Sequence, residues 1–525
     1  MFYSIDFGTC NSVVSFLNNN SEIDHVYDPV GGNILIPTTI YFIQDDINST
    51  FEHRKNYFIG SEANENYNIY KNVNCYFYQF KRLLGITSKS NPFEFDFIKK
   101  LNIQYELDED NVYIFIPAND DKKIKISIVE LTSLYIKGLC DYINNKNINV
   151  YITAPAYFND LQKTQLMNAY KLSNCKVLKY YNEPTAATIY YLNTFYKKEQ
   201  GSKKIAIFDI GGGTTDITIV EYDFESKTCD IIDVSGNNSL GGVDIDMLLI
   251  DDIYKNYNID KNNKKWKKKI SDMAEHIKIQ LSTQSNVKVI LEEVPVLINN
   301  NVIIKELLEI QYTRTKFNSI INNIVIELTN LLTDMQKTHD IFDIIPIGGT
   351  TQIPIIHEKI NINKNNEIQQ STFLYKSIVS DGACMMSKLI QNNDDFIIMD
   401  IVPMNLYIKT NDYLCVIPKN TKIPTLKEYI LTTSRDAQRS IEIEIFEGDN
   451  KYHVGSYTIL NIPPYKKGSI LITLLFKINI SGLMNITVQG CMNKANEKGT
   501  FELNKDIKII SNTCIKNLLK SCLKK

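Results

Sequence analysis

The apolar positions along the chain follow two different patterns. Between residues 1 and 393, short apolar runs that predict buried strands alternate with segments at helical spacing, for example residues 128–143. From Ile401 onward the runs are short and separated by turn residues, and residues 440–446 alternate strictly between apolar and polar side chains. The pattern therefore predicts an α/β region at 1–393 and an all-β sandwich at 401–503.

Two segments share one order of features, which is an apolar strand, an aspartate, a glycine turn and a second strand. In residues 205–219 the features after the strand are Asp209, Gly211, Gly212, Gly213, Thr214 and Asp216. In residues 2–16 they are Asp6, Gly8 and Thr9. Backbone N–H groups in such a turn bind anions, and a nearby carboxylate can hold a cation. One copy could equally be a tight hairpin without a ligand. Two copies predict a duplicated fold with a triphosphate and its metal between the lobes.

Composition narrows the class of protein. A chain of 525 residues is expected to form several domains, and a net charge of -3 gives no support for nucleic-acid binding. We see no secretory signal at Met1 and no apolar run long enough for a membrane span. The ten cysteines lack a CxxC pair, and the six histidines lack zinc-ligand spacing. We therefore expect a cytoplasmic protein with reduced thiols, in which Cys10 serves as a small residue.

Several single residues gain meaning only from their position. Alone, Lys81 and Arg82 would be surface side chains. Asp160 follows a strand and a proline, and we expect it to cap the next helix. Glu183 stands at the end of the strand at 177–181, where a catalytic or metal-shell carboxylate would lie.

Seven motifs occur in a fixed order: IDFGTCNS, FKRLLG, ITAPAYFND, NEPTAA, FDIGGGTTD, SLGGVDID and IGGTTQIP. Together they resemble the 70-kDa heat-shock chaperones of the DnaK type over nearly the whole chain. The resemblance implies an actin-like ATPase domain with a duplicated ribonuclease-H-like fold at 1–393. It also implies a hydrophobic linker at 394–400, a peptide-binding β-sandwich at 401–503, and a short C-terminal helix at 504–525 as a vestigial lid. A lidless channel should exchange peptides faster.

The same resemblance implies a function. The chain would be an ATP-dependent molecular chaperone that hydrolyses ATP to ADP and phosphate and thereby binds and releases unfolded polypeptide segments. A J-domain co-chaperone and a nucleotide-exchange factor are the implied partners. A low-activity homologue that binds an assembly partner is the alternative. A small-molecule kinase of the same fold is a third reading, which the linker and the sandwich oppose.

The resemblance also implies roles for single residues. The catalytic set around the γ-phosphate would comprise Asp6, Lys81, Glu183, Asp209 and Thr214. Asp6 and Asp209 would hold Mg²⁺ through its waters, and Asp216 would lie near K⁺. The remaining nucleotide contacts would come from Gly8, Thr9, Cys10, Asn11, Gly211, Gly212, Gly213, Gly241, Gly242, Glu275, Lys278, Ser282, Gly348, Gly349 and Gln352. The peptide channel would be lined by Ile408, Leu431, Ser434, Ile441 and Ile443, although plain sandwich core explains these isoleucines equally well.

Two positions depart from the family pattern. Ile279 and Gln352 stand where the family usually has arginines that stack on the adenine. Losing that stacking should weaken nucleotide binding. The three acids Asp6, Glu183 and Asp209 nevertheless favour retained hydrolysis, because a pure scaffold has no need for all of them.

Overall fold

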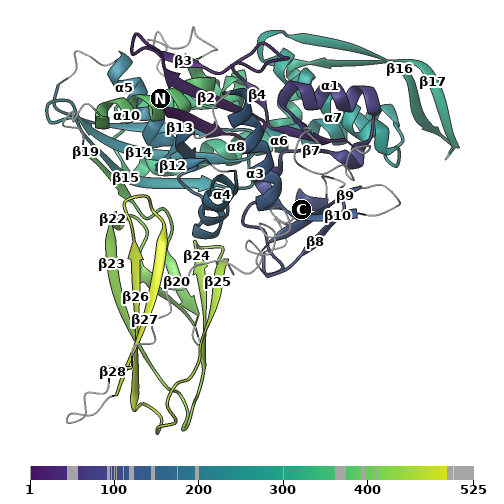
Figure 1. Cartoon of the computed structure of the whole chain (residues 1–525). Helices are drawn as coiled ribbons and strands as arrows, with labels where there is room; N and C mark the ends of the chain where they lie inside the picture. Colours follow the sequence, from purple (N-terminus) through teal and green to yellow (C-terminus); the bar gives the residue numbers. More distant parts are fainter. Residues whose placement is uncertain are drawn as a thin grey trace.

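The computed structural model contains helices and several β-sheets, and is therefore a mixed α/β structure (Figure 1). It describes residues 2–43, 57–90, 95, 97–99, 101, 103–109, 111–117, 123–143, 148–173, 175–195, 200–299, 301–360, 374–391, 397–409, 412–492 and 500–501. The predicted C-terminal helix at 504–525 lies outside these residues. Within them, no helix is both long enough and apolar enough to cross a bilayer.

The first large sheet has the strand order β12-β11-β1-β2-β3, with β4 beside β2. Its central strand, β1, pairs antiparallel with β2 and parallel with β11. The strands are β1 (Phe2–Phe7), β2 (Asn11–Leu17), β3 (Ile23–His25), β4 (Ile36–Pro37), β11 (Asn149–Ala154) and β12 (Lys176–Asn182). Tyr3, Ser4, Ile5 and Phe7 of β1 are buried, so both faces of this strand are covered.

The second large sheet repeats this arrangement in the order β18-β13-β14-β15-β19-β22. Its strand β13 pairs antiparallel with β14 and parallel with β18, as β1 does with β2 and β11. The strands are β13 (Ser202–Ile210), β14 (Thr215–Asp223), β15 (Thr228–Asn237), β18 (Asp343–Ile347), β19 (Ile397–Ile401) and β22 (Lys422–Ile423). The two segments with the same order of features in the sequence are thus the corresponding hairpins of two similar sheets.

Helices cover these sheets, and smaller elements surround them. The helices are α1 (Gly60–Tyr70), α3 (Ile128–Tyr142), α4 (Asp160–Leu172), α5 (Glu183–Phe195), α6 (Gly242–Tyr257), α7 (Lys264–Thr283), α8 (Arg314–Thr338), α9 (Pro354–Lys359) and α10 (Leu374–Gln391). The 3₁₀ turns are η1 (Val73–Cys75), η2 (Phe80–Leu83) and η3 (Gly349–Gln352). The small sheets contain β5 (Thr39–Phe42), β6 (Tyr57–Ile59), β7 (Tyr76–Tyr78), β8 (Tyr105–Leu107), β9 (Val112–Pro117), β10 (Lys123–Ser127), β16 (Asn286–Ile298) and β17 (Asn301–Thr313).

Local sequence explains where these helices begin. Ser127 and Glu130 form a reciprocal capping box at the start of α3, which confirms the helix predicted at 128–143. For α4 the prediction was wrong by one residue. Asn159 is the cap and pairs with Gln162, whereas Asp160 is the first helical residue. The side chain of Asp160 is therefore available for a contact outside its own helix.

The C-terminal strands form two four-stranded sheets packed on one apolar core. One sheet contains β20 (Leu406–Lys409), β21 (Tyr413–Ile417), β24 (Ile441–Glu447) and β25 (Tyr452–Ile459). The other contains β23 (Thr425–Thr432), β26 (Ile470–Ile478), β27 (Met484–Met492) and β28 (Thr500–Phe501). Figure 1 shows both sheets on one side of the α/β part, joined to it through β19 and β22.

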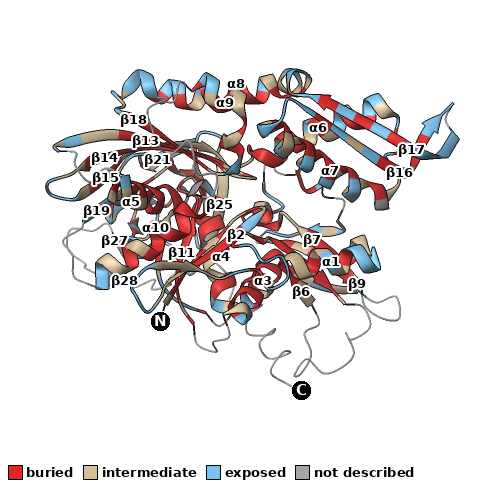
Figure 2. Ribbon diagram, turned by 90° about the horizontal axis from the view of Figure 1, so that it is seen from above, coloured by how far each residue is buried: buried red, intermediate tan, exposed pale blue. Residues whose placement is uncertain are grey.

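The buried residues lie mainly between the helices and the sheets. Red, buried residues fill the layers between helices and sheets in Figure 2, whereas the far end of the hairpin β16–β17 is mostly pale blue. The apolar residues form one cluster around the first sheet, two around the second sheet and one between the C-terminal sheets. The large α/β sheets therefore give a rigid frame to the turns at their strand ends.

Candidate nucleotide site

A cavity of about 400 Å³ lies where the turns of the two large sheets face each other. It brings together most of the predicted nucleotide residues, which are Asp6, Gly8, Thr9, Cys10, Asn11, Lys81, Glu183, Asp209, Gly211, Gly212, Thr214, Glu275, Lys278, Ser282, Gly348, Gly349 and Gln352. Gly213, Asp216, Gly241 and Gly242 are absent from the lining. Gly241 and Gly242 nevertheless contact the lining, because Gly241 packs on Gly212 and the N–H of Gly242 donates to the carbonyl of Gly211. Asp216 is paired with Asp209 across the β13–β14 hairpin, and Gly213 directly follows Gly212 in the chain.

Glycine is required where the two turns meet. A Cβ on Gly212 would lie 2.5 Å from the Sγ of Cys10, which belongs to the opposite turn. Gly348 has φ +81, and a Cβ there would lie 2.3 Å from the carbonyl oxygen of Ile210. The two backbones can therefore approach each other closely, which is the arrangement in which successive N–H groups of a turn bind an anion.

The carboxylates of Asp6, Glu183 and Asp209 line the cavity together with the ammonium of Lys81. Asp216 faces Asp209 across the β13–β14 hairpin, and the two residues are 2% and 8% exposed. Burial, reinforced by Asp216 and Asp6, raises the pKa of Asp209 to about 8. Burial also raises the pKa of Glu183 well above its usual value, although the ammonium of Lys81 opposes this shift. The Nζ of Lys81 lies 3.0 Å from Oε1 of Glu183, and the Lys81 side chain is 5% exposed.

These carboxylates suit a hydrated divalent cation. Their raised pKa values indicate that negative charge is costly there without a positive counterpart. Among the described residues, no three His, Cys, Asp or Glu side chains converge closely enough to ligate one metal directly. Mg²⁺ prefers oxygen ligands and keeps several of its waters, so it fits carboxylates that stand one water away.

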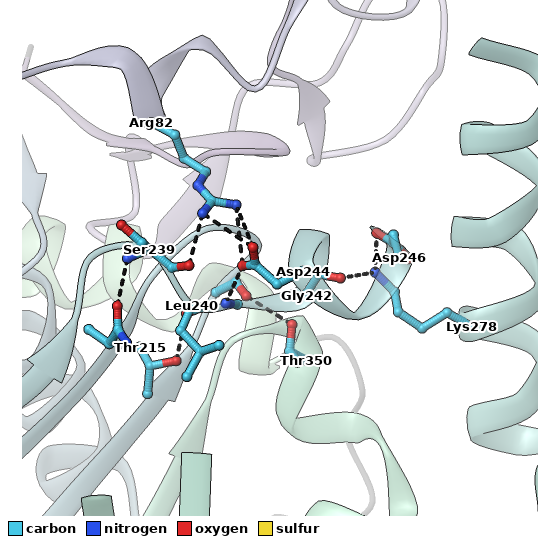
Figure 3. Close-up of polar contacts among 12 residues, drawn as sticks. Arg82, Thr215, Ser239, Leu240, Gly242, Asp244, Asp246, Lys278 and Thr350 are labelled. Atoms are coloured by element: carbon cyan, nitrogen blue, oxygen red, sulfur yellow. Dashed lines mark hydrogen bonds and ion pairs between the residues drawn. The ribbon is translucent and has the colours of Figure 1, made fainter. Parts of the chain in front are cut away.

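Arg82 joins η2 to α6 beside the cavity. Its guanidinium donates to Asp244 Oδ2 at 3.2 Å and to the carbonyl of Ser239 at 2.9 Å, as Figure 3 shows. Asp244 in turn accepts the N–H of Gly241 at 2.8 Å at the start of α6. The sequence predicted no partner for Arg82, because 162 residues separate it from Asp244. The SLGGVDID turn was the only signal that could have suggested one.

Another part of the cavity is lined by Lys278, Ile279 and Gln352. Lys278 is held by Asp246 at 2.8 Å and by the carbonyl of Gly242 at 3.2 Å (Figure 3). The neighbouring Ile279 is 56% exposed. Gln352 has a buried Nε2 that finds no hydrogen-bond partner among the described residues. This part can therefore pack on a flat ligand, but it has no guanidinium to stack on it.

The strand β19 continues the second sheet. It runs parallel to β15 and antiparallel to β22, so residues 397–400 of the predicted linker are part of a sheet. Residues 394–396 of that linker lie outside the described part of the chain. The Lys422 Nζ lies 2.9 Å from Asp230 on β15. The C-terminal sheets are therefore attached to the second large sheet by strand pairing.

A second attachment involves α4. The backbone N–H of Asp160 donates to Oε2 of Glu447 at 3.0 Å, and the N–H of Met484 donates to Oδ1 of Asp160 at 2.8 Å. Burial raises the pKa of Asp160 to about 6 and that of Glu447 to about 7, while Lys163 opposes both shifts. Sequence reasoning missed this contact because it treated Asp160 only as a local cap.

The predicted peptide residues lie between or beside the C-terminal sheets. Ile408 and Ile443 are buried in the core, and Leu431 and Ile441 are partly buried against it. Ser434 is exposed. Their place is compatible with sandwich core and with the rim of a channel alike.

Comparisons with known proteins agree with this geometry. The family model described as "Hsp70 protein" matches residues 3–521. Chaperone protein dnaK of Cyanidium caldarium is 28% identical over 508 residues, which cover 92% of this chain and 77% of that protein. Chaperone protein HscA of Buchnera aphidicola is 28% identical over 514 residues, covering 92% and 91%. Chaperone protein DnaK of Thermotoga neapolitana is 31% identical over 371 residues, covering 66% and 61%.

Proposed function

The chain belongs to the Hsp70 protein family, and from this premise we propose that it is an ATP-dependent molecular chaperone whose hydrolysis cycle drives binding and release of unfolded polypeptide segments. The observation that carries the proposal is the single cavity that joins two glycine turns, buried carboxylates and Lys81. Family members are ATPases that use Mg²⁺, and they work with co-chaperones of the DnaJ and GrpE type. We propose that a J-domain protein and a nucleotide-exchange factor act on this chain too.

We propose the following division of the chain. Residues 1–393 form an actin-like, duplicated ATPase domain, 394–400 the interdomain linker, 401–503 the peptide-binding β-sandwich and 504–525 a vestigial lid. The repeated strand order of the two large sheets supports the first part. The paired C-terminal sheets on one core support the third. A cytoplasmic location remains a prediction from the sequence.

We assign roles around the phosphates as follows. The turns at Gly8–Asn11 and Gly211–Thr214 would bind the phosphates through backbone N–H groups and hydroxyls. Asp6 and Asp209 would hold hydrated Mg²⁺, which neutralises the charge that develops on the phosphates. Asp216 would lie near K⁺.

Lys81 and Glu183 would act on the water. The ion pair keeps the Lys81 ammonium at the cavity wall, where it can reach the γ-phosphate and the attacking water. Glu183 would accept a hydrogen bond from that water and orient it. Phosphoryl transfer depends mainly on such positioning and charge neutralisation.

The two attachments of the C-terminal sheets supply a route for coupling. Because β19 is a strand of the sheet that carries Asp209, movement of that sheet would change how well β19 pairs. We propose that nucleotide state shifts the balance between this docked arrangement and a released one, and thereby changes peptide affinity at Ile408, Leu431, Ser434, Ile441 and Ile443.

Calorimetry with ATP and with ADP, in Mg²⁺ and K⁺, followed by a hydrolysis assay on the same preparation, tests the proposal. We expect both nucleotides to bind and turnover to rise with an unfolded peptide. Ile279 is exposed, and the Nε2 of Gln352 has no hydrogen-bond partner among the described residues; both observations favour one alternative, a homologue that binds an assembly partner with little turnover. Partner or peptide binding without measurable nucleotide binding would support that alternative.

A further inference from the structure

Two buried sulfur atoms lie unusually close together, away from the nucleotide cavity. Sγ of Cys140, near the end of α3, is 2.7 Å from Sγ of Cys175, just before β12. Non-bonded heavy atoms usually lie about 3.5–4.0 Å apart, whereas a disulfide bond measures about 2.0 Å. The two sulfurs therefore lie between contact distance and bonding distance, and a small movement brings them to either.

The pair is chemically asymmetric. The hydrogen bond from Cys140 lowers the pKa of Cys175, and this effect outweighs the burial that opposes it. The same hydrogen bond, with burial, raises the pKa of Cys140. Cys175 is thus the sulfur that becomes the thiolate, which is the reactive form of cysteine. By contrast, burial raises the pKa of Cys10 and of Cys384 to about 12, so those thiols stay protonated.

Tyr170 packs in the same buried cluster as the two cysteines. Its side chain is fully buried, and its hydroxyl has no hydrogen-bond partner among the described residues. Burial raises its pKa, and Cys175 and Cys140 add to the shift.

We propose that Cys140 and Cys175 are a redox modification site that closes to a reversible disulfide when the protein meets a hydroperoxide. The Cys175 thiolate attacks the peroxide oxygen, takes up that oxygen as a sulfenic acid, and with one proton releases water or an alcohol. The Cys140 thiol then attacks this sulfur, the S–S bond forms, and the sulfenic oxygen leaves as water. The two thiols lose two electrons, and the peroxide gains them. A dithiol reductant reverses the reaction.

The disulfide would tie the end of α3 to the start of β12. The closed loop contains β11 and α4, which carry Thr153 beside Asp6 and Asp160 at the C-terminal sheets. β12 itself leads directly to Glu183. Oxidation therefore stiffens a segment that touches both the cavity and the attachment of the C-terminal sheets.

Intact-mass spectrometry of the full chain after hydrogen peroxide treatment and thiol blocking tests the proposal. We expect the wild type to lose two hydrogens, to map the new bond to Cys140 and Cys175, and to regain both thiols with dithiothreitol. Cys140→Ser and Cys175→Ser should each abolish the bond. Cys384→Ala, which changes another buried thiol, should keep it.

A second measurement guards against variants that fail to fold. The oxidised wild type should unfold several degrees higher than the reduced wild type, because the bond restricts the unfolded chain. Oxidation that adds oxygen without forming the Cys140–Cys175 bond, or a bond mapped to any other pair, would overturn the proposal. An unchanged mass and unfolding temperature would overturn it as well.

Discussion

The two large sheets share an order of four strands, β11-β1-β2-β3 and β18-β13-β14-β15, but carry different side chains at the cavity. The first sheet and the elements beside it supply Asp6, Lys81 and Glu183, of which Lys81 and Glu183 are buried and directly paired. The second supplies Asp209 and, through η3, the side of the cavity with Gln352, whose Nε2 has no hydrogen-bond partner among the described residues. Each sheet adds an edge strand that the other lacks, which is β12 beside β11 in the first and β19 beside β15 in the second. In the proposed mechanism both halves contribute to the chemistry, since Asp209 also holds Mg²⁺, and the second half adds recognition of the base and coupling through β19.

The largest expected effect comes from the first half. Lys81→Ala should lower turnover by about 100-fold or more, since removing one preorganised charge donor from a transition state has effects of this size. Nucleotide binding should persist, because the glycine turns remain. Single-turnover hydrolysis and calorimetry on the same sample separate the two effects. Lys125→Ala, at an exposed ion pair of the first lobe, is the control. Normal turnover in Lys81→Ala would disprove the assigned role.

One substitution beside η3, in the second half, should increase the affinity of the protein for ADP. Gln352→Arg restores a guanidinium at the base side and should tighten ADP binding by about 2- to 30-fold, equivalent to about 0.5–2 kcal/mol of cation–π energy. Gln284→Arg, at the exposed end of α7, controls for added charge. Equal affinity in the wild type and Gln352→Arg would mean that the adenine does not lie beside η3.

The attachment of α4 should depend on pH. The pKa values of Asp160 and Glu447 are about 6 and about 7 when docked, above the usual value of about 4 for carboxyl groups in water. The docked form therefore holds protons more tightly, so docking is strongest below about pH 4, weakens as the pH rises from about 4 to about 7, and is constant above that. With one dye on the α/β part and one on the C-terminal sheets, energy transfer in the wild type should fall as the pH rises. In Glu447→Gln this fall should be several-fold less steep.

A matched control sharpens this result. Glu442 lies on the same strand, β24, and is exposed, so Glu442→Gln should leave the pH profile unchanged. The amide at Glu447→Gln can still accept the N–H of Asp160, yet it carries no charge at any pH. An identical pH profile in the wild type and Glu447→Gln would assign the titration to other groups.

The smallest expected effect on docking comes from a substitution at the edge of the second large sheet. Lys422→Ala removes the ion pair with Asp230, in which the lysine side chain is 48% exposed. Exposed pairs contribute about 0–1 kcal/mol, and salt screens them. The dye-labelled protein should show slightly less docking at low salt and no difference at high salt. A large loss at both salt concentrations would mean that Lys422 positions β22 by packing.

The sequence predicted well whatever depends on local pattern. The strand–aspartate–glycine-turn segments identified both glycine turns that line the cavity, and helical spacing identified α3 at 128–143. Contacts between distant segments were missed, such as Arg82 with Asp244 and Asp160 with Met484. Each side chain there has an ordinary local role, and only the packing of lobes reveals the partner. Cys140 and Cys175 escaped notice for the same reason, because 35 residues separate them.

The place of β19 has a consequence for the released form. In the proposed released form, β19 would leave β15 as an open sheet edge, whose N–H and carbonyl groups could pair with any extended chain. Because β19 would stay tethered near that edge, it would compete with other chains at a high effective concentration. Return of β19 to β15 would thus protect the released form against self-association.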